Sequence, residues 1–308
     1  MTKGKAFEYA TARLFFKYFI GLGGIVEIID DKNYINVKDS FDSLNSNTQN
    51  LLLRAASVGV AEVVQLEPKL QDINEKLVIR IAPDSFGKNG DVRDVILSKE
   101  NWEIGVSCKH NHQALKHQRL SNIIDFGQVW AGYPVSRNYW DEVNPIFQML
   151  QNYKSNGLDW KDIPNKEQSI YVPLLTSFLK ELNFLDSQYT DLAYKFTEYL
   201  AGRRDFYKFV MDEKHKGINI YCYNLHGELG TDIIGSTVPL VSLPTAFISK
   251  KWKLNIDNSK SNTTLIIEMD NDWIVGLRLH SASTKVETSL KFDSQPIKLP
   301  NNLLTIRR

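Results

Sequence analysis

The chain has 308 residues, and its 37 lysines and arginines nearly balance its 36 aspartates and glutamates, which leaves a formal net charge of +1. A hydrophobic share of 43% is enough to bury one large core or two moderate ones. The charge balance excludes a protein that binds nucleic acid through a uniformly basic surface, so any such binding must come from local clusters of basic residues.

The N-terminal region and the cysteines bear on the compartment. Arg13, Lys17 and Glu27 interrupt the most apolar N-terminal stretch, so no segment there reaches the ~18 apolar residues that a membrane span needs. The first residues lead into an amphipathic segment, which argues against a secretory signal peptide. Cys108 and Cys222 are too few for a disulfide framework or a cysteine-rich zinc site. We therefore expect a cytoplasmic protein with no membrane partner.

The first third of the chain predicts two helices and a strand. Apolar residues recur at helical spacing over 5–19, and the glycine-rich segment 21–24 ends that pattern. A second helical pattern covers 48–65. Residues 77–81 form a short apolar run, which predicts a strand that leads through a loop toward residue 90.

The rest of the chain changes from helical to β character. We expect a helix over 112–120 and, after a mixed stretch over 127–162, further helices over 172–182 and 188–200. From residue 217 onward strand patterns dominate, in 218–225, 252–256, 263–268, 273–279 and 286–292. The sequence contains no internal repeat and no low-complexity linker, so domain boundaries are soft.

The segment 90–119 carries the clearest chemical signal. Two short apolar runs, 92–97 and 104–106, flank the polar turn 98–101 and predict a β-hairpin. Its acids and its lysine suit metal-dependent cleavage of phosphodiester bonds. Mg²⁺ takes one or two carboxylates plus substrate phosphate, and a lysine can steady the attacking water or the charge that develops on phosphorus. The candidates for this set are Asp91, Asp94, Glu103 and Lys109.

Exposed hairpins also carry acids and lysines merely for solubility. The order of the residues favours chemistry, because an acid opens the first strand and the second ends at Lys109, directly before a basic, histidine-rich segment. Glu8 is a further candidate, since it lies beside the apolar stripe of the first helix and can point toward the acids of the hairpin. A solvated helix glutamate is the alternative for Glu8.

Four segments of the chain together resemble one known family: KGKAFEYATAR at 3–13, GDVRDV at 90–95, EIGVSCKHNHQALKHQRLS at 103–121 and WIVGLRLHSASTKVETSLKFD at 273–293. The hairpin resembles the PD-(D/E)xK nuclease core, and the four segments resemble the HaeIII group of type II restriction endonucleases. The resemblance implies a prokaryotic enzyme that uses Mg²⁺ to cut double-stranded DNA, at GGCC and with blunt ends. It also implies a cognate cytosine methyltransferase as functional partner. Whether the enzyme forms a homodimer on DNA is left undecided by the sequence.

The chain departs from the family pattern at Ser107, where the core motif has an acid two residues before the lysine. A serine cannot serve as an anionic ligand, so another acid must replace it. Glu103 has the same strand parity as Ser107 and Lys109, and therefore Glu103 or Glu8 can supply the missing carboxylate.

The sequence does not decide which of two aspartates is the catalytic acid at the start of the hairpin. Folding the hairpin about Lys99 and Glu100 places Asp91 opposite Cys108 or Lys109, which favours Asp91. Asp94, however, immediately heads an unbroken apolar run. Both stay as candidate catalytic residues and metal ligands.

Sequence reading in duplex DNA requires side chains that reach the major groove, where arginine or lysine pairs with guanine. Nothing in one sequence separates base readers from phosphate holders, and any basic cluster can be a solvated face. The candidate DNA contacts are His110, Asn111, His112, Lys116, Arg119, Arg203, Arg204, Arg278, His280 and Lys285, with Lys291 as a further base reader.

The sequence thus predicts an α/β (α+β) protein with a PD-(D/E)xK core and a β-rich C-terminal part. We expect the helices and the nuclease core in 1–200 and a DNA-recognition region in 201–308. Two alternatives stay open for the function: a non-catalytic DNA-binding protein that keeps a degenerate nuclease core, and a structure-directed DNA repair nuclease.

Overall fold

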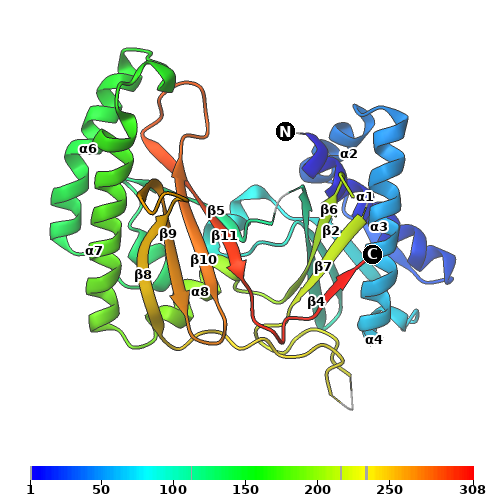
Figure 1. The fold of residues 1–308 in the computed structure, drawn as a ribbon. Helices are drawn as coiled ribbons and strands as arrows, with labels where there is room; N and C mark the ends of the chain where they lie inside the picture. The colour runs from blue at the N-terminus through cyan, green and yellow to red at the C-terminus, as the bar shows by residue number, and fades with distance from the viewer. Residues whose placement is uncertain (1, 112, 216, 233–234) are drawn as a thin grey trace. The chain divides into compact units, whose positions relative to one another are not determined.

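The structure, a computed structural model, describes residues 2–111, 113–215, 217–232 and 235–308. Contacts divide the chain into two compact units that are each discontinuous in sequence. The first unit contains Met1–Gln113, Arg203–Ser242 and Asn301–Arg308, and the second contains Ala114–Gly202 and Leu243–Pro300. The α+β class predicted from the sequence, with strands concentrated toward the C-terminus, is confirmed (Figure 1).

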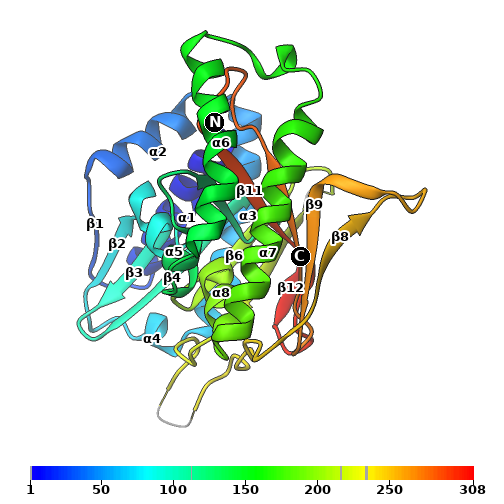
Figure 2. The same cartoon turned by 90° about the vertical axis from the view of Figure 1, so that its left-hand side faces the viewer.

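The first unit is built on a mixed seven-stranded sheet in the order β1-β2-β3-β4-β6-β7-β12. β1 pairs with β2 and β4 with β6 in parallel, and the other neighbours are antiparallel. Figure 2 shows β1 to β4 side by side. The strands are β1 (Val26–Ile28), β2 (Leu77–Ile81), β3 (Val95–Lys99), β4 (Trp102–His110), β6 (Phe206–Asp212), β7 (Gly217–Tyr223) and β12 (Thr305–Arg307). The helices are α1 (Thr2–Gly21), α2 (Lys32–Asp42), α3 (Ser46–Leu66) and α4 (Pro68–Gln71), with a 3₁₀ turn at Asp84–Asn89.

One face of this sheet and the apolar sides of α1 and α3 form the core of the first unit. Phe7 and Ala10 of α1 are buried in the same cluster as Val106 and Cys108 of β4. Gly59 lets α3 approach β6 closely, because a Cβ at this position would lie 2.5 Å from the ring of Phe209. The opposite parity of β4, which includes Ser107 and Lys109, therefore faces away from this core.

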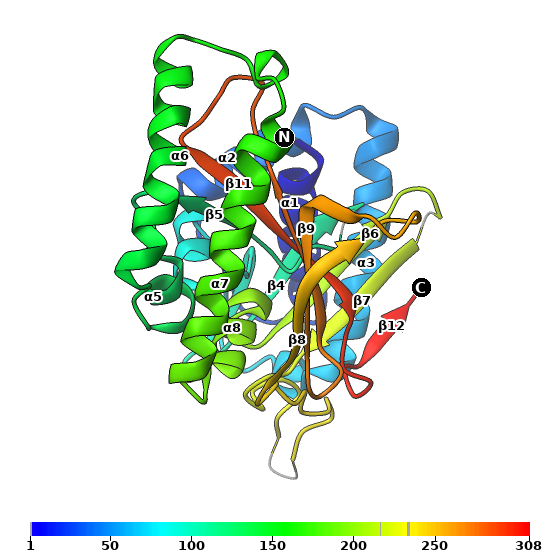
Figure 3. The same cartoon turned by 60° about the vertical axis from the view of Figure 1, so that its left-hand side comes forward.

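The second unit combines an antiparallel five-stranded sheet, in the order β5-β11-β10-β9-β8, with four helices among its described residues. Phe292 of β11 contacts Trp130 and Phe178, so helices cover one face of the sheet; Figure 3 shows α7 beside β8 and β9. The strands are β5 (Lys116–Ser121), β8 (Phe247–Leu254), β9 (Lys260–Met269), β10 (Ile274–His280) and β11 (Ser289–Lys298). The helices are α5 (Phe126–Ala131), α6 (Arg137–Ser155), α7 (Val172–Gln188) and α8 (Leu192–Ala201), with a 3₁₀ turn at Trp160–Asp162 and a π-helical turn at Glu167–Tyr171.

Several predicted elements are confirmed and others are wrong. The helices predicted over 5–19 and 48–65 correspond to α1 and α3, and the strand over 77–81 is β2. The helix predicted over 112–120 is wrong, because residues 116–121 form β5 and pair with the distant strand β11. The stretch over 127–162 described as mixed contains α6, and α2 was not predicted.

The discontinuous units change how the two halves of the sequence relate to the fold. β6, β7 and β12 come from the C-terminal third, yet they complete the sheet that contains β4. β5 comes from the N-terminal half and belongs to the second unit. The assignment of DNA recognition to residues 201–308 stays a prediction. No helix in the described part of the chain is long and apolar enough to cross a membrane.

Candidate active site

The hairpin of β3 and β4 has a register that differs from the one expected. Lys99 pairs with Trp102, so the turn is centred on Glu100 and Asn101, one residue later than predicted. Lys99 stays in the strand because it is buried and its Nζ donates to the carbonyl oxygen of Lys69 at 2.6 Å. The shift places Asp94, and not Asp91, next to the C-terminal half of β4, which carries Lys109. The Asp94 backbone N donates to Val106 O at 2.9 Å.

Asp94 and Lys109 form the centre of the candidate site. Lys109 Nζ lies 3.0 Å from Asp94 Oδ2, and the two side chains are 23% and 20% exposed. The same oxygen accepts hydrogen bonds from Ser107 Oγ at 3.1 Å and from the Cys108 backbone N at 2.7 Å. Burial alone would lower the pKa of Lys109, but the charge of Asp94 and its hydrogen bond raise it above the usual value. Lys109 is therefore a firmly protonated cation.

Glu8 of α1 belongs to the same electrostatic neighbourhood. The residue is only 5% exposed, and its Oε2 accepts from Lys5 Nζ at 3.2 Å. Burial, and after it the negative charge of Asp94, raises the pKa of Glu8 to about 8, while Lys5 and Lys109 act in the opposite direction. A buried carboxyl group whose pKa a second carboxylate raises is suited to share a cation with that carboxylate.

Asp91 and Glu103 have other partners. Asp91 accepts from Arg93 Nε at 2.9 Å and from Arg93 Nη2 at 2.8 Å, and Glu103 lies 2.9 Å from Arg93 Nη1 and 3.1 Å from Arg80 Nη2. Gly105 leaves room for Arg93, because a Cβ there would lie 2.3 Å from Arg93 Cδ. The structure thus joins Asp91 and Glu103 through arginines and does not bring them to Asp94.

The shared parity of Glu103 and Lys109 does not bring these residues together. They lie on one face of β4, but six residues separate them, which is roughly 20 Å along a strand. Glu103 therefore cannot take the place of the acid that the family motif has at Ser107. In its place the structure offers Ser107 itself, which donates to Asp94, and the carboxylate of Glu8.

These residues fit a hard divalent cation. Among the described residues no group of three or more histidine, cysteine, aspartate or glutamate side chains is arranged to hold a metal ion. Mg²⁺ does not need such a cage, since it keeps several waters and takes one or two carboxylates together with substrate phosphate. Asp94 and Glu8 supply two carboxylates, and both are oxygen donors of the kind that Mg²⁺ prefers.

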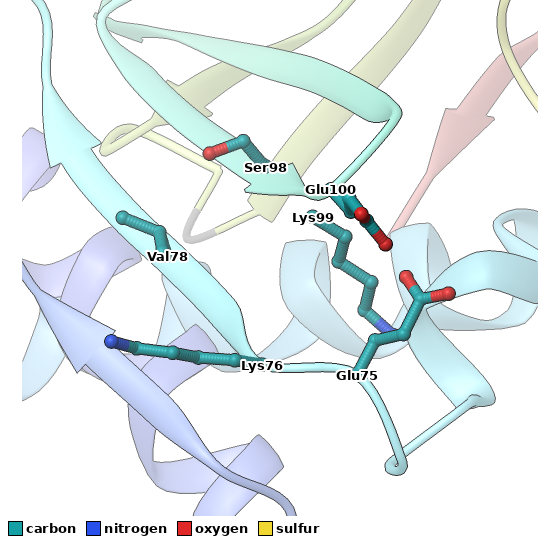
Figure 4. Close-up of a pocket in the computed structure, with 6 residues that line it drawn as sticks. All are labelled: Glu75, Lys76, Val78, Ser98, Lys99 and Glu100. Atoms are coloured by element: carbon teal, nitrogen blue, oxygen red, sulfur yellow. The ribbon is translucent and has the colours of Figure 1, made fainter.

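A pocket elsewhere in the first unit lies at the other end of the hairpin. Glu75, Lys76, Val78, Ser98, Lys99 and Glu100 line it, and Figure 4 shows them around the β2 and β3 ends next to the turn. Asp94 and Lys109 are not among the lining residues. The pocket is therefore separate from the candidate site.

The candidate DNA contacts around the end of β4 are held by local partners. His110 Nε2 lies 3.0 Å from Glu213 Oε2, and the Glu213 backbone N donates to Asn111 Oδ1 at 2.9 Å. Asn111 has a positive φ of 58°, which asparagine tolerates better than most residues. His112 lies outside the described residues. Arg203 packs against Gly90 through its side chain, whereas Arg204 is exposed.

The candidates in the second unit differ in how freely they can reach a ligand. Lys116 is buried, and its Nζ lies 3.8 Å from the centre of the Tyr199 ring, so it packs within the unit. Lys285 is held by Asp159 at 2.8 Å, and His280 Nε2 lies 2.8 Å from Asp293. Arg119 donates to Ser289 Oγ at 2.8 Å. Arg278 is exposed on β10.

Sequence reasoning missed one charged residue at the site. Lys208 of β6 pairs in register with Ser107 and is 3% exposed. A single lysine inside the apolar run of β6 was the only local signal, and nothing in the sequence indicated that β6 would lie beside β4.

The α+β fold, with a strand hairpin that brings Asp94 and Lys109 together, is consistent with a nuclease of the restriction-endonuclease type. A model of the HaeIII restriction endonuclease family matches residues 4–300. The chain is also 35% identical to the type II restriction enzyme HaeIII of Haemophilus aegyptius over 98% of this chain and 96% of that protein. No solved structure matches the chain.

The chain belongs to the HaeIII restriction endonuclease family. It is accordingly a type II site-specific deoxyribonuclease, a hydrolase of restriction-modification systems that acts on double-stranded DNA. The resemblance stated from the four sequence segments is confirmed across nearly the whole chain.

Proposed function

We propose that the enzyme cuts double-stranded DNA in a Mg²⁺-dependent reaction with Asp94, Glu8 and Lys109 at its catalytic centre. The observation that carries this proposal is the ion pair of Asp94 and Lys109 at 3.0 Å, beside the buried Glu8, whose pKa burial and the charge of Asp94 raise. Of the acids predicted from the sequence, Asp91 and Glu103 form ion pairs with Arg93, and the proposed catalytic centre does not include them.

Each of the three residues has a distinct task. Asp94 and Glu8 would hold the metal ion, which supplies Lewis-acid charge at the phosphate when it is bound. Lys109 donates from Nζ and can turn from Asp94 toward the attacking water or toward an oxygen of the scissile phosphate. Ser107 Oγ and the Cys108 N–H fix the orientation of the Asp94 carboxylate, so that its second oxygen is directed elsewhere.

Binding of a cation would be coupled to the release of a proton from the Glu8 carboxyl group. With a pKa of about 8, Glu8 is largely protonated at neutral pH in the free protein. Glu8 would lose this proton if a cation were held next to both carboxylates, since the positive charge would favour their ionised forms. Lys5, which contacts both Glu8 and Asp84 at 3.2 and 2.8 Å, limits the cost of that ionisation.

We further propose that the target is GGCC and that the cut is blunt. The family membership supports this proposal. Two exposed arginines, Arg204 in the loop before β6 and Arg278 on β10, offer donors suited to guanine O6 and N7. A cytosine methyltransferase that protects the same site is the expected functional partner, and a homodimer would match the symmetry of a palindromic target.

The test uses the wild-type protein on linear DNA that contains one GGCC. Cleavage in Mg²⁺ but not in EDTA, with both strand ends mapped to the centre of the site on a sequencing ladder, is the expected result. Cutting that follows flaps or mismatches instead of GGCC would identify a structure-directed nuclease, and binding without cutting would identify a non-catalytic protein.

A further inference from the structure

Lys208 lies beside the proposed catalytic centre and is not one of the three residues assigned to it. β6 runs parallel to β4, and Lys208 pairs with Ser107 while Val210 pairs with Lys109. Tyr207 and Phe209 belong to the core cluster that α1 and α3 cover. Because side chains alternate along a strand, Lys208 lies on the other face of the sheet, the face of Ser107 and Lys109.

The environment of Lys208 is unusual for a lysine. The residue is 3% exposed, and Nζ donates to the carbonyl oxygen of Gln113 at 2.9 Å. The ring centre of Tyr223 lies 6.0 Å from the same nitrogen. Lysine is rarely buried to this extent, since a desolvated ammonium group is costly. A position that keeps one next to a reactive site therefore calls for an explanation beyond packing.

Electrostatics connect Lys208 to the two residues of the ion pair. Burial and the positive charge of Lys109 lower the pKa of Lys208 to about 7, and Asp94 acts in the opposite direction. The charges of Lys109 and Asp94 therefore both act on the Lys208 amino group. Charges in a partly desolvated region interact more strongly than charges in water.

We propose that Lys208, whose charged form the phosphates of bound DNA favour, is a second cation of the catalytic centre, a positioning residue that acts through Asp94 and Lys109. It stands where the neighbouring strand meets Ser107, the position at which the family motif carries an acid. Its positive charge lies on the same face of the sheet as Lys109, so that Lys109 can turn from Asp94 toward the phosphate, where negative charge grows in the transition state. This inference rests on the proposed function, because it presumes that Asp94 and Lys109 perform the reaction.

The test removes the charge and keeps an unbranched side chain of similar size. Lys208→Met is compared with Lys99→Met, a matched control in the same sheet. Lys99 is also buried, at 6% exposure, and its Nζ also donates to a backbone carbonyl oxygen, that of Lys69. Lys99 lies at the turn end of the hairpin, away from Asp94. Single-turnover cleavage of a GGCC duplex, metal-free binding of that duplex and thermal unfolding are measured for each variant.

We expect Lys208→Met to lower the cleavage rate by on the order of 10²-fold. Duplex affinity should change by less than about threefold and the protein should still unfold cooperatively, because the lysine acts on the transition state and its removal relieves a buried charge. Lys99→Met should keep the wild-type cleavage rate. Lys208→Gln, whose amide can still donate to Gln113 O, should show the same loss of rate as Lys208→Met.

Three results would overturn the proposal. One is a cleavage rate of Lys208→Met within about threefold of wild type. Another is an equal loss in Lys99→Met, which would assign the effect to buried lysines in general. The third is loss of the folded state in both Lys208→Met and Lys208→Gln, which would make the lysine structural. If the wild-type protein cuts and Lys109→Ala does not, any of these results leaves the proposed function standing.

Discussion

Two clusters of charge lie on the same face of β4 and differ in how their carboxylates are occupied. At one end, Arg93 holds Asp91 with two nitrogens and reaches Glu103 with a third, and Arg80 adds a further contact to Glu103. At the other end, one lysine and two neutral donors hold a single oxygen of Asp94. A carboxylate saturated by arginine serves the fold, whereas one that keeps an oxygen free can serve a metal ion.

The largest expected effect tests this comparison directly. Asp94→Asn should lower Mg²⁺-dependent cleavage by on the order of 10³-fold or more, since an amide lacks the charge that anchors a hard cation. Asp91→Asn is its control and should keep cleavage within about threefold of wild type, with a loss of about 1 kcal/mol of stability from the weaker contact with Arg93. Rates on a GGCC duplex and denaturant midpoints check both. Equal losses of cleavage in the two variants would contradict the distinction between the clusters.

The lysine of the second cluster should affect rate more than binding. Lys109→Ala is expected to lower the cleavage rate by about 10²- to 10³-fold while the affinity for the duplex in Ca²⁺ changes by less than about threefold. Arg80→Ala, which removes a cation from the first cluster, should leave the cleavage rate near wild type. A Lys109→Ala variant that cuts at the normal rate would remove the active-site assignment.

Glu67 extends the comparison to a buried carboxylate that is held by neutral hydrogen-bond donors. Tyr207 OH and the Gly230 N–H donate to its Oε1 at 2.6 and 2.8 Å, and burial raises its pKa to about 7. The folded protein therefore prefers protonated Glu67. This contribution to stability is complete below the unfolded pKa, near 4.5, and is lost as the pH rises through about 7.

Urea unfolding from pH 4.5 to 8 measures this effect. The free energy of unfolding of the wild type, relative to Glu67→Gln, should fall across that interval by up to roughly 3 kcal/mol. The glutamine retains an oxygen that can accept the same two hydrogen bonds but does not titrate. Parallel pH profiles for the two proteins would show that Glu67 is ionised in the fold.

The smallest expected effect concerns base reading. Arg278→Ala should cost ~1–3 kcal/mol in discrimination at one base pair of the target if this exposed arginine reads guanine. Lys285→Ala should weaken cleavage of all sequences alike or leave it unchanged, because Asp159 and the carbonyl oxygen of Gly157 already hold this lysine. Cleavage rates on GGCC and on its single-base variants, at fixed salt, give the answer. An unchanged sequence preference in Arg278→Ala would show that Arg278 does not read a base, and Arg204 would be the next candidate.

Local patterns predicted what local physics determines. The apolar stripe of α1 and the short run of β2 depend only on residues near in sequence, and both elements were predicted well. β5 was predicted as a helix because its strand form depends on pairing with β11, far away in the chain. The acids and the lysine of the hairpin were predicted as site residues from the sequence, and they stay a prediction. The preference for Asp94 over Asp91 required the strand register and the contacts of Arg93, and the position of Lys208 required the pairing of β6 with β4.

The order of strands in the first sheet has a consequence for how the enzyme is made. Val106 of β4 pairs with Tyr207 of β6, about 100 residues later in the chain, so one edge of β4 stays unpaired until that segment has been synthesised. A growing chain that carries Asp94 and Lys109 thus lacks the neighbour that supports them. Nuclease activity would appear only late in synthesis, and truncated chains that end before β6 should be harmless to the DNA of the cell that makes them.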